Sequence, residues 1–438
     1  MLEIIKFMYK NIRQISKRNR EVFILNKDGF VVRIPLSDKK ELDKYAPREN
    51  LDKKAPEFIG ELADLGLLRF KNYKPKERKI NFDEALVVAK GMRPIYGGPV
   101  IAHLAITGRC NMRCKYCSVR KVHSANAEEL TTEEYKIIIK KLSALGVFQI
   151  GLTGGEPTLR NDIVELAGYI TSLGIACNMT TNGWSVSEQL AKNLCKKGGL
   201  EQSQVSLDSY IKEHHENLRG TNSYARALKT IGILQNAGMK VGVDCVVSKN
   251  NIADIPKFVD FLARRKIPGL TLIKLKKGDL PLDVFQKLLP DYEEYGKLIA
   301  DLCRRENAMP EVTIDCASVC NLHYSMTREE QAELHSAGCP AGHTLISIAP
   351  NGDLYPCAAL SSERFKLGNA LRDDLAETWK NNRILRDLRN IKEKVRGACR
   401  GCDRLDSCRA GCRGIANELD NLYASDPSCA REEVSENG

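Results

Sequence analysis

The chain has 438 residues, 43% of them hydrophobic and 28% charged, which is the balance of an ordinary soluble protein. No run approaches the roughly 18 apolar residues that cross a membrane, and Lys6, Lys10 and Arg13 interrupt the apolar N-terminus. We therefore expect a cytoplasmic protein without a membrane partner. The net charge of +11 is spread along the chain without a nucleic-acid reader motif, so we expect a solvated surface and no nucleic-acid partner. Attraction of an acidic partner is the alternative.

Residues 1–90 are expected to form a separate small α+β module. Residues 21–35, EVFILNKDGFVVRIP, predict a hairpin that turns at Asp28-Gly29, because that dipeptide accepts positive φ. Residues 55–70 predict a helix. An apolar stripe at helical spacing, which predicts a packing helix, comprises Ile4, Ile5, Met8, Ile12 and Ile15.

Residues 91–276 alternate short β-rich runs with amphipathic helical runs. The strands are expected at 100–107, 147–154, 176–183, 204–208, 240–248 and 270–275. The first intervening helix can begin at Thr131 or Thr132 and end at Gly146. Six β–α units in series predict parallel strands with right-handed crossovers, hence an α/β fold with a partial (β/α)6 TIM-like barrel. In such barrels the chemistry gathers at the C-terminal ends of the strands.

Residues 277–338 predict a helical connector, and residues 339–438 a cysteine-rich iron–sulfur domain with little periodic core of its own. The chain has 16 cysteines, which is many for a cytosolic protein, where disulfides are rare. They are also clustered, which points to metal or iron–sulfur ligation. Bound metal would then stabilise a tail that cannot bury enough apolar surface alone.

Three cysteines follow the first barrel strand at the spacing Cys110-x3-Cys114-x2-Cys117. Three thiolates on one short loop can hold three irons of a cubane cluster and leave the fourth iron without a protein ligand. A structural zinc site would need four ligands. This loop offers no fourth, although His103 and His123 are near in sequence.

This spacing, with Tyr116 before the last cysteine, resembles the signature of the radical S-adenosylmethionine (SAM) superfamily. The resemblance implies that the open iron chelates the amino and carboxylate groups of SAM. An electron from the cluster then cleaves SAM to a 5′-deoxyadenosyl radical. The protein's part would be to position the cluster and to exclude oxidants.

The segment Gly154-Gly155-Glu156-Pro157, after the second strand, is similar to the family's element that receives the SAM amino group. Its glycines would let the backbone approach SAM, and Glu156 would accept from the ammonium. By the same resemblance, contacts to the ribose hydroxyls and the methionine carboxylate fall on Thr181, Asn182, Ser206 and Arg219. Residues 154–157 could instead form an ordinary turn, and Arg219 could be a surface cation.

The second cysteine array reads Cys339-x12-Gly352-x4-Cys357, then Cys399-x2-Cys402-x5-Cys408-x3-Cys412-x16-Cys429. Zinc fingers are the alternative, but seven cysteines divide poorly into zinc tetrads, and His343 is the only histidine within the array. The spacing resembles the SPASM domain, which binds two auxiliary clusters. The family pattern implies an outer set of Cys399, Cys402, Cys408 and Cys429. The implied inner set is Cys339, Cys357 and Cys412. Cys320 or Cys316 could close the inner set, or its last iron could stay open, giving three [4Fe-4S] clusters in all.

SPASM enzymes include peptide crosslinking maturases, sulfatase maturases and enzymes of tetrapyrroles or cofactors. Sulfatase maturases carry an acidic residue where this chain has Ala358, which argues against that class. Residues 1–90 are similar in arrangement to winged-helix leader-binding modules, and a packing extension is the alternative.

We therefore expect a radical SAM oxidoreductase that forms a thioether or carbon–carbon crosslink in a ribosomally made peptide carrying a leader segment. A flavodoxin or ferredoxin is the expected electron donor. The same chemistry on a tetrapyrrole or other cofactor precursor is the first alternative. A non-catalytic electron-transfer protein is the second, and the predicted SAM contacts oppose it.

Overall fold

The computed structural model describes residues 98–117, 128–200, 202–278, 280–303, 310–318, 320–321, 338–419, 421–427 and 429. Toward the N-terminus it describes the backbone of four strands, at 12–18, 21–26, 31–35 and 93–94. Among the helices of these residues, none is long and apolar enough to cross a membrane.

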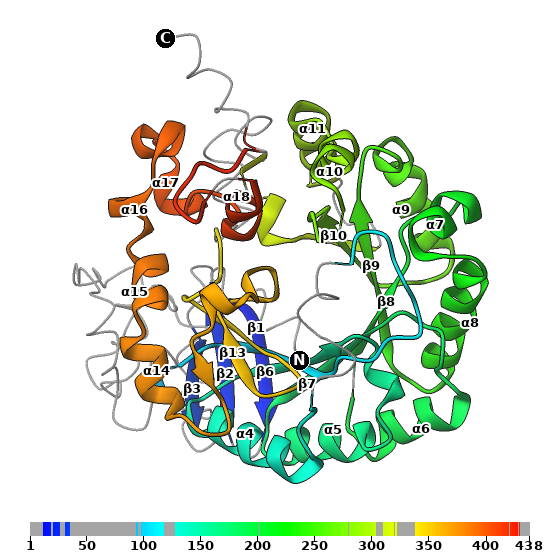
Figure 1. The fold of residues 1–438 in the computed structure, drawn as a ribbon. Coiled ribbons are helices and arrows are strands. Elements are labelled where there is room, and N and C mark those ends of the chain that lie inside the picture. Colours follow the sequence, from blue (N-terminus) through cyan, green and yellow to red (C-terminus); the bar gives the residue numbers. More distant parts are fainter. Residues whose placement is uncertain are drawn as a thin grey trace, which may run out of the picture.

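Six neighbouring parallel strands form the centre of the molecule (Figure 1). They are β5 (Ile101–Thr107), β6 (Gln149–Gly154), β7 (Ala176–Thr181), β8 (Gln202–Ser206), β9 (Lys240–Val247) and β10 (Gly269–Lys274). Each pairs in parallel with the next along the chain. The six predicted strands and their parallel order are confirmed, and the sheet curves into a partial barrel.

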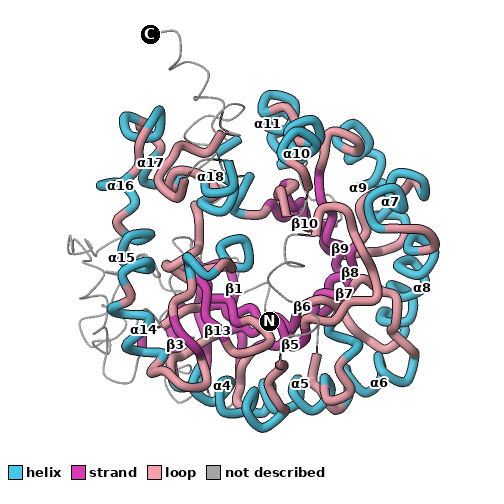
Figure 2. Tube along the Cα trace, viewed as in Figure 1, coloured by secondary structure: helices cyan, strands magenta, loops and turns pink. Residues whose placement is uncertain are grey.

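Helices cover the outside of these strands, as Figure 2 shows. They are α4 (Thr132–Ala144), α5 (Ile163–Ser172), α6 (Glu188–Lys196), α7 (Lys212–Arg219), α8 (Ser223–Asn236) and α9 (Ile255–Arg264). Thr131 and Glu134 form a capping box at the start of α4, and Gly146 follows the helix with φ of 79°. The predicted start and stop signals of this helix are confirmed.

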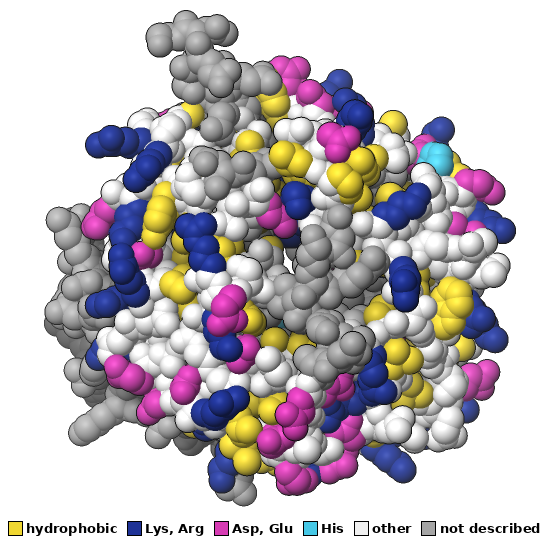
Figure 3. Space-filling view, viewed as in Figure 1, with side chains coloured by type: hydrophobic (Ala, Val, Ile, Leu, Met, Phe, Trp, Pro, Cys, Tyr) yellow, Lys and Arg dark blue, Asp and Glu magenta, His cyan; other side chains and the backbone are white. Residues whose placement is uncertain are grey.

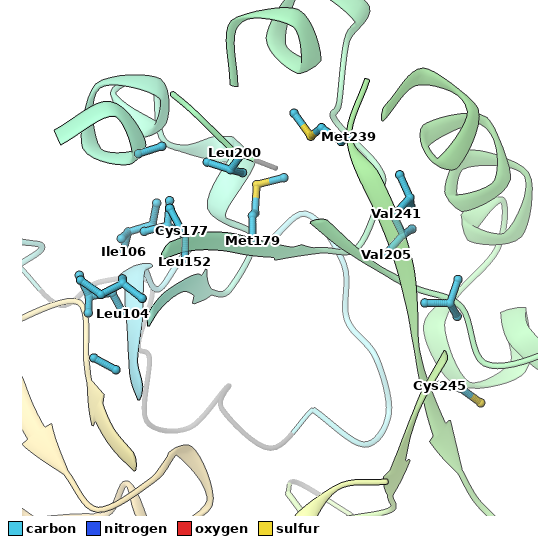
Figure 4. Close-up of a cluster of buried hydrophobic side chains, with 14 of the residues drawn as sticks. Leu104, Ile106, Leu152, Cys177, Met179, Leu200, Val205, Met239, Val241 and Cys245 are labelled. Carbon is cyan, nitrogen blue, oxygen red and sulfur yellow. The ribbon is translucent and has the colours of Figure 1, made fainter. Parts of the chain in front are cut away.

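The hydrophobic core lies between the strands and these helices (Figure 4). Its fully buried side chains include Leu104, Leu152, Met179, Val205 and Val241. Because side chains alternate along a strand, the opposite face points into the barrel lumen. That face carries the partly buried polar residues His103, Asn178, Gln204 and Asp244. The lumen is therefore polar, and it leads to the strand ends where chemistry is expected.

Within the described residues, the sheet extends beyond the six predicted strands to ten. After α10 (Leu282–Leu288) and α11 (Tyr292–Cys303), β11 (Glu311–Ile314) adds to β10 in parallel, so the predicted helical connector also holds a strand. At the other edge, β12 (Leu345–Ile348) pairs with β5 in parallel. Two short antiparallel strands, β13 (Asp353–Tyr355) and β14 (Gly368–Asn369), follow it. The start of the cysteine-rich tail is thus part of the main sheet.

The rest of the described tail contains several short helices. They are α14 (Leu375–Asn381), α15 (Arg383–Arg389), α16 (Ile391–Lys394), α17 (Leu405–Cys408) and α18 (Arg413–Leu419). The backbone N–H of Lys277, just after β10, donates to Glu418 Oε2 on α18 at 2.9 Å. The tail therefore contacts the barrel at the C-terminal end of β10. On the face shown in Figure 3, basic and acidic side chains are interspersed over barrel and tail.

The N-terminal strands form a separate antiparallel sheet in the order β1 (Ile12–Arg18), β2 (Glu21–Asn26), β3 (Val31–Pro35), β4 (Arg93–Pro94). The pairing of β2 with β3 confirms the predicted hairpin. The predicted helical stripe is wrong from residue 12 onward, because these residues pair with β2, and such pairing overrides local periodicity. The turn at Asp28-Gly29 and the helix at 55–70 lie outside the described residues, so the winged-helix comparison stays a prediction.

Candidate functional site

A cavity of about 310 Å³ lies at the C-terminal ends of the barrel strands. All three cysteines of the first loop, Cys110, Cys114 and Cys117, line it. Every predicted SAM contact lines it as well, except Pro157, which is buried beside it. Those contacts are Tyr116, Gly154, Gly155, Glu156, Thr181, Asn182, Ser206 and Arg219. Their role in binding SAM stays a prediction, but the fold brings them to one place.

The cysteine loop is fixed to two neighbouring elements. The backbone N–H of Lys115 donates to Leu218 O on α7 at 2.9 Å. The Asn182 side chain, which follows β7, donates to Cys110 Sγ at 3.7 Å. Within the loop, the N–H of Cys117 donates to Cys114 O at 3.3 Å. The loop that carries the three cysteines is therefore held by barrel elements that are far apart in sequence.

Gly154 and Gly155 are required by packing of backbone against backbone. A Cβ on Gly155 would lie 2.1 Å from Arg109 O, and one on Gly154 would lie 2.3 Å from Thr107 O. Gly154 also has φ of 138°, a conformation that side chains disfavour. The prediction that these glycines make room for SAM is therefore incomplete, since they first allow the end of β6 to pack against the cysteine loop.

Glu156 is fully buried, and four donors surround its carboxylate. Oε1 accepts from the Thr158 N–H (3.1 Å), the Thr158 hydroxyl (2.6 Å) and the Thr181 hydroxyl (2.8 Å), and Oε2 accepts from the Asn182 N–H (2.7 Å). Burial raises the pKa of Glu156, and these hydrogen bonds oppose that shift. The carboxylate thus joins the ends of β6 and β7, in addition to any contact with SAM.

Arg219 is not a surface cation, because it forms a buried ion pair with Asp208. Its Nε and Nη2 donate to the two Asp208 oxygens at 2.7 and 3.0 Å, and the side chains are 8% and 1% exposed. The Tyr116 hydroxyl donates to Asp208 Oδ2 at 2.5 Å, and the Val246 N–H donates to Oδ1 at 3.0 Å. Burial alone would raise the pKa of Asp208, but the Arg219 guanidinium lowers it.

Asp208 was missed at the sequence level as a site residue. It closes the predicted strand QVSLD, and a carboxylate at the C-terminal end of a barrel strand was the available signal. Lys274 was missed too. It ends β10, is fully buried and lines the cavity, and its Nζ donates to Asn321 Oδ1 at 2.6 Å. Lys276 lines the cavity beside it and pairs with Asp315 at 2.8 Å.

The tail cysteines lie in two groups. In the inner group, Cys357 is close enough to Cys339 and Cys412 for their charges to interact. The resemblance implies the same grouping of these three cysteines. In the outer group, Cys408 is likewise close enough to Cys399 and Cys429 for their charges to interact. Cys402 follows Cys399 on the same turn, where its backbone N–H donates to Cys399 O at 3.2 Å.

The fourth ligand of the inner group, for which Cys320 and Cys316 are the candidates, stays a prediction. Cys320 is 1% exposed. It packs in one buried cluster with Cys408 and Cys429, which belong to the outer group. Its sulfur donates to Asp426 Oδ2 at 3.7 Å, and the same oxygen accepts from the N–H of Cys412 in the inner group at 2.7 Å. Of Cys316 the structure describes the backbone, in a short 3-10 helix (Cys316–Ser318). The next residue, Ala317, packs against Cys412 of the inner group.

The donor sets fit iron–sulfur clusters. All are thiols, the ligands that such clusters use. Burial raises the pKa of Cys114 to about 11 and that of Cys357 to about 12. A metal would displace these protons on binding, as thiolate ligation requires.

Comparison with known proteins agrees with this donor chemistry. The profile of the radical SAM superfamily matches residues 104–262, and that of SPASM, an iron–sulfur cluster-binding domain, matches residues 339–403. The chain is 30% identical over 318 residues to mycofactocin maturase MftC of Mycobacterium tuberculosis. The aligned region spans 72% of this chain and 78% of MftC. It is 28% identical over 343 residues to the AdoMet-dependent heme synthase of Methanosarcina barkeri, and this aligned region spans 74% of this chain and 94% of the synthase.

The fold is also that of a solved structure, Streptococcus suis SuiB bound to precursor peptide SuiA. The TM-score is 0.66 at 18% identity, over 95% of this chain and 98% of SuiB. The two profiles imply SAM and iron–sulfur clusters as cofactors, so the non-catalytic electron carrier considered above is set aside. The cysteine loop at the end of β5, the strand-end cavity and the two cysteine groups of the tail all agree. This chain belongs to the radical SAM enzymes that carry a SPASM domain.

Proposed function

We propose that this enzyme oxidatively crosslinks a ribosomally made peptide and that it holds three [4Fe-4S] clusters. One observation carries the proposal. The cavity is lined by the three cysteines of the first loop and also by Ala358, the residue after Cys357 of the inner group. A substrate in this cavity would therefore lie between the source of the radical and an auxiliary cluster that can accept an electron.

SAM on the first cluster would supply a 5′-deoxyadenosyl radical, which removes a hydrogen atom from an unactivated carbon. Forming the thioether or carbon–carbon bond removes one further hydrogen from the substrate. This hydrogen would leave as a proton, and an auxiliary cluster held by the tail cysteines could take up its electron. The chain's own residues would orient SAM, with Arg219 near its carboxylate and the 154–157 segment near its amino group.

The peptide is favoured by MftC, which is named a maturase, and by SuiB, which was solved with a precursor peptide. A peptide of this kind carries a leader, and we assign leader binding to residues 1–90. An edge strand of its antiparallel sheet could pair with an extended leader. A flavodoxin or ferredoxin would supply the electron. The second candidate is a tetrapyrrole substrate, which the similarity to the AdoMet-dependent heme synthase favours.

The direct test is anaerobic incubation with SAM, reductant and either candidate precursor peptides or iron-porphyrin precursors, read by mass spectrometry. A peptide product lighter by two hydrogens is the expected result. A modified tetrapyrrole with unchanged peptides would overturn the peptide assignment. The variant with Cys110, Cys114 and Cys117 all replaced by Ala should lose SAM cleavage and keep roughly two-thirds of the iron. Cleavage retained in that variant would refute the radical assignment.

A second test concerns residues 1–90. If they bind the leader, deleting them should leave slow SAM cleavage intact and weaken peptide turnover strongly, because remote binding energy is lost. Supplying the module in trans should restore part of the activity at lower affinity. An insoluble or cluster-poor truncation would indicate a packing extension. A fully clustered truncation that modifies peptide at the parent rate would refute leader binding.

A further inference from the structure

The net charge of +11 is less evenly distributed than expected, because one segment of the tail carries more than half of it. Residues 380–400 contain eight Lys or Arg and two Asp or Glu, a net charge of +6. They run from the end of α14 through α15 and α16 into the 3-10 turn at Gly397–Gly401. Dark-blue side chains follow α15 and α16 along the left edge of Figure 3. Six of the eight cations are exposed, and together they form the basic face: Lys380, Arg383, Arg386, Lys392, Arg396 and Arg400.

The other charged residues of the segment do not neutralise this face. Asp387 accepts from Lys394 Nζ at 2.5 Å and from the Tyr423 hydroxyl at 2.8 Å, so its charge is already compensated. Arg389 donates to two backbone oxygens outside the segment, at 2.7 and 2.6 Å, and therefore serves the fold. Glu393 is exposed and offers one negative charge against six positive ones.

The basic face has no comparable role in the fold. Arg383 and Arg386 lie three residues apart on α15, and like charges that are neighbours on a helix surface destabilise the helix. Arg383 is also the first residue of α15, where the helix dipole disfavours a cation. The exposed cations of this face thus lower the stability of the helix, which points to a role outside the fold. Within the described residues, no carboxylate forms an ion pair with five of the six, namely Lys380, Arg383, Arg386, Arg396 and Arg400.

The basic face lies over the outer cysteine group. Ile391 of α16 and Val395, which follows this helix, pack in one buried cluster with Cys399. The backbone N–H of Cys399 donates to the Ser425 hydroxyl at 3.1 Å, and this hydroxyl donates to Arg396 O at 3.0 Å. A cluster held by the four cysteines of the outer group would therefore lie just beneath the basic face.

The basic face and the strand-end cavity lead to different cysteine groups. The cavity reaches the inner group through Ala358, and none of its described lining residues belongs to the segment 380–400. The basic face reaches the outer group through α16. A partner on this face would therefore not compete with the substrate, and an electron taken up at the inner group could leave at the outer one.

The proposed crosslinking chemistry requires an electron acceptor outside the protein. Of the two hydrogens that the substrate loses, one goes to the 5′-deoxyadenosyl radical as an atom, and the other leaves as a proton and one electron. That electron reduces an auxiliary cluster, which has to be oxidised again before the next turnover. The acceptor is therefore a one-electron carrier.

We propose that the basic face docks a small acidic carrier protein of the flavodoxin or ferredoxin kind, which takes one electron from the outer auxiliary cluster in each turnover. The cluster is oxidised and the carrier reduced by one electron, while the proton passes to solvent. This rests on the clusters and the oxidative chemistry of the proposed function but not on the identity of its substrate. A positive face attracts a negative partner over a distance and raises the association rate, which suits a carrier that must bind and leave quickly.

The test measures electron transfer by anaerobic stopped-flow absorption, from reconstituted enzyme that has been reduced with dithionite and desalted to an oxidised, acidic flavodoxin. The triple variant Arg383→Gln/Arg386→Gln/Lys392→Gln removes three charges from the basic face and leaves the residues next to the cysteines in place. Its second-order rate constant should be lower by about tenfold or more at low salt, because electrostatic steering is lost. The rate constant of the wild-type protein should fall as the salt concentration rises.

The control removes the same charge from exposed positions on α6 and α8, with the triple variant Lys192→Gln/Lys196→Gln/Lys229→Gln. It should change the rate constant by less than about twofold. Iron content and SAM cleavage with dithionite should match the wild-type protein in both triple variants. Electron transfer to flavodoxin should also persist in the variant that lacks the first cluster, because the electron leaves through the outer cluster.

Equal rate constants for the two triple variants, or a wild-type rate constant that salt does not change, would overturn the proposal. Weaker binding of a precursor peptide by the basic-face variant, with unchanged electron transfer, would overturn it as well, since the face would then belong to the peptide. Absence of SAM cleavage in the wild-type protein would count against the proposed function alone, because electron transfer to flavodoxin needs only the auxiliary clusters.

Discussion

The buried ion pair between Asp208 and Arg219 gives the sharpest stability prediction. Replacing Asp208 by Asn keeps the shape but leaves the Arg219 charge buried without its partner. Breaking a buried pair in this way costs about 3–5 kcal/mol, because the remaining charge is neither solvated nor compensated. The side chains are 1% and 8% exposed, so water cannot replace the lost partner. We expect Asp208→Asn to lower the free energy of unfolding by about 3 kcal/mol or more.

The assay is urea unfolding of the protein under anaerobic conditions, with Glu165→Gln as the matched control. Glu165 pairs with Lys136 at 2.6 Å, but its side chain is 56% exposed, so its loss should leave the midpoint unchanged. The double variant Asp208→Asn/Arg219→Met should be less destabilised than the sum of the two single variants. Equal midpoints for Asp208→Asn and Glu165→Gln would refute the reasoning.

The pH dependence of this effect has a definite sign. The pKa of Asp208 is lowered in the folded protein, below its ordinary value of 3.8. Its contribution to stability is therefore fully present above that value and is lost as the pH falls through the folded pKa. The difference between wild type and Asp208→Asn should be constant at neutral pH and should shrink below about pH 4. A difference that grows in acid would contradict the assignment.

Three further predictions concern Gly155 and Glu156, which line the cavity, and Asp244, which lies in the barrel lumen. Gly155→Ala should displace the cysteine loop and lower the iron content, since the added Cβ would lie 2.1 Å from Arg109 O. The control Gly232→Ala should retain wild-type iron content, because nothing lies within 4 Å of its added Cβ. Glu156→Gln turns an acceptor into a donor among four donors and should cost about 1–3 kcal/mol in urea unfolding; an unchanged midpoint would contradict this. Burial raises the pKa of Asp244 to about 6, so wild-type stability should fall as the pH rises from about 4 to 6, and Asp244→Asn should abolish that slope; a persisting slope would exclude Asp244 as its source.

The barrel could be predicted because its local signals agree with the global fold. In the first helix, Thr131, Glu134 and Gly146 mark both ends, and the apolar side chains between them are buried in the core, except that of Ile137. Parallel order then follows from the alternation of strands and helices. The N-terminal strand at Ile12–Arg18 had no such agreement. Its apolar spacing suited a helix as well as a strand, and only pairing with β2 decides between them.

The site residues could be predicted only where a motif marks them. The 154–157 segment and the first cysteine loop have recognisable spacings, and the structure brings them to one cavity. No sequence motif marks Asp208 or Lys274. An isolated carboxylate or ammonium at a strand end is common on protein surfaces, so neither residue differs in sequence from an ordinary surface charge. Their importance depends on burial and on partners such as Tyr116, which is 92 residues away in sequence from Asp208.

The ligand sets of the auxiliary clusters show where spacing stops being informative. The spacing of cysteines in the sequence indicates which of them share a turn, as Cys399 and Cys402 do. A cubane cluster, however, takes its ligands from several segments of the chain. Cys320 and Asp426 are 106 residues apart, and the Cys320 sulfur donates to Asp426 Oδ2 at 3.7 Å. The same oxygen accepts from the Cys412 N–H at 2.7 Å, so this buried aspartate connects the segment before the tail to a cysteine of the inner group. Asp426→Ala removes this shared acceptor and should lower the free energy of unfolding by about 1–3 kcal/mol, measured by anaerobic urea unfolding. An unchanged midpoint would show that the two contacts do not contribute to stability.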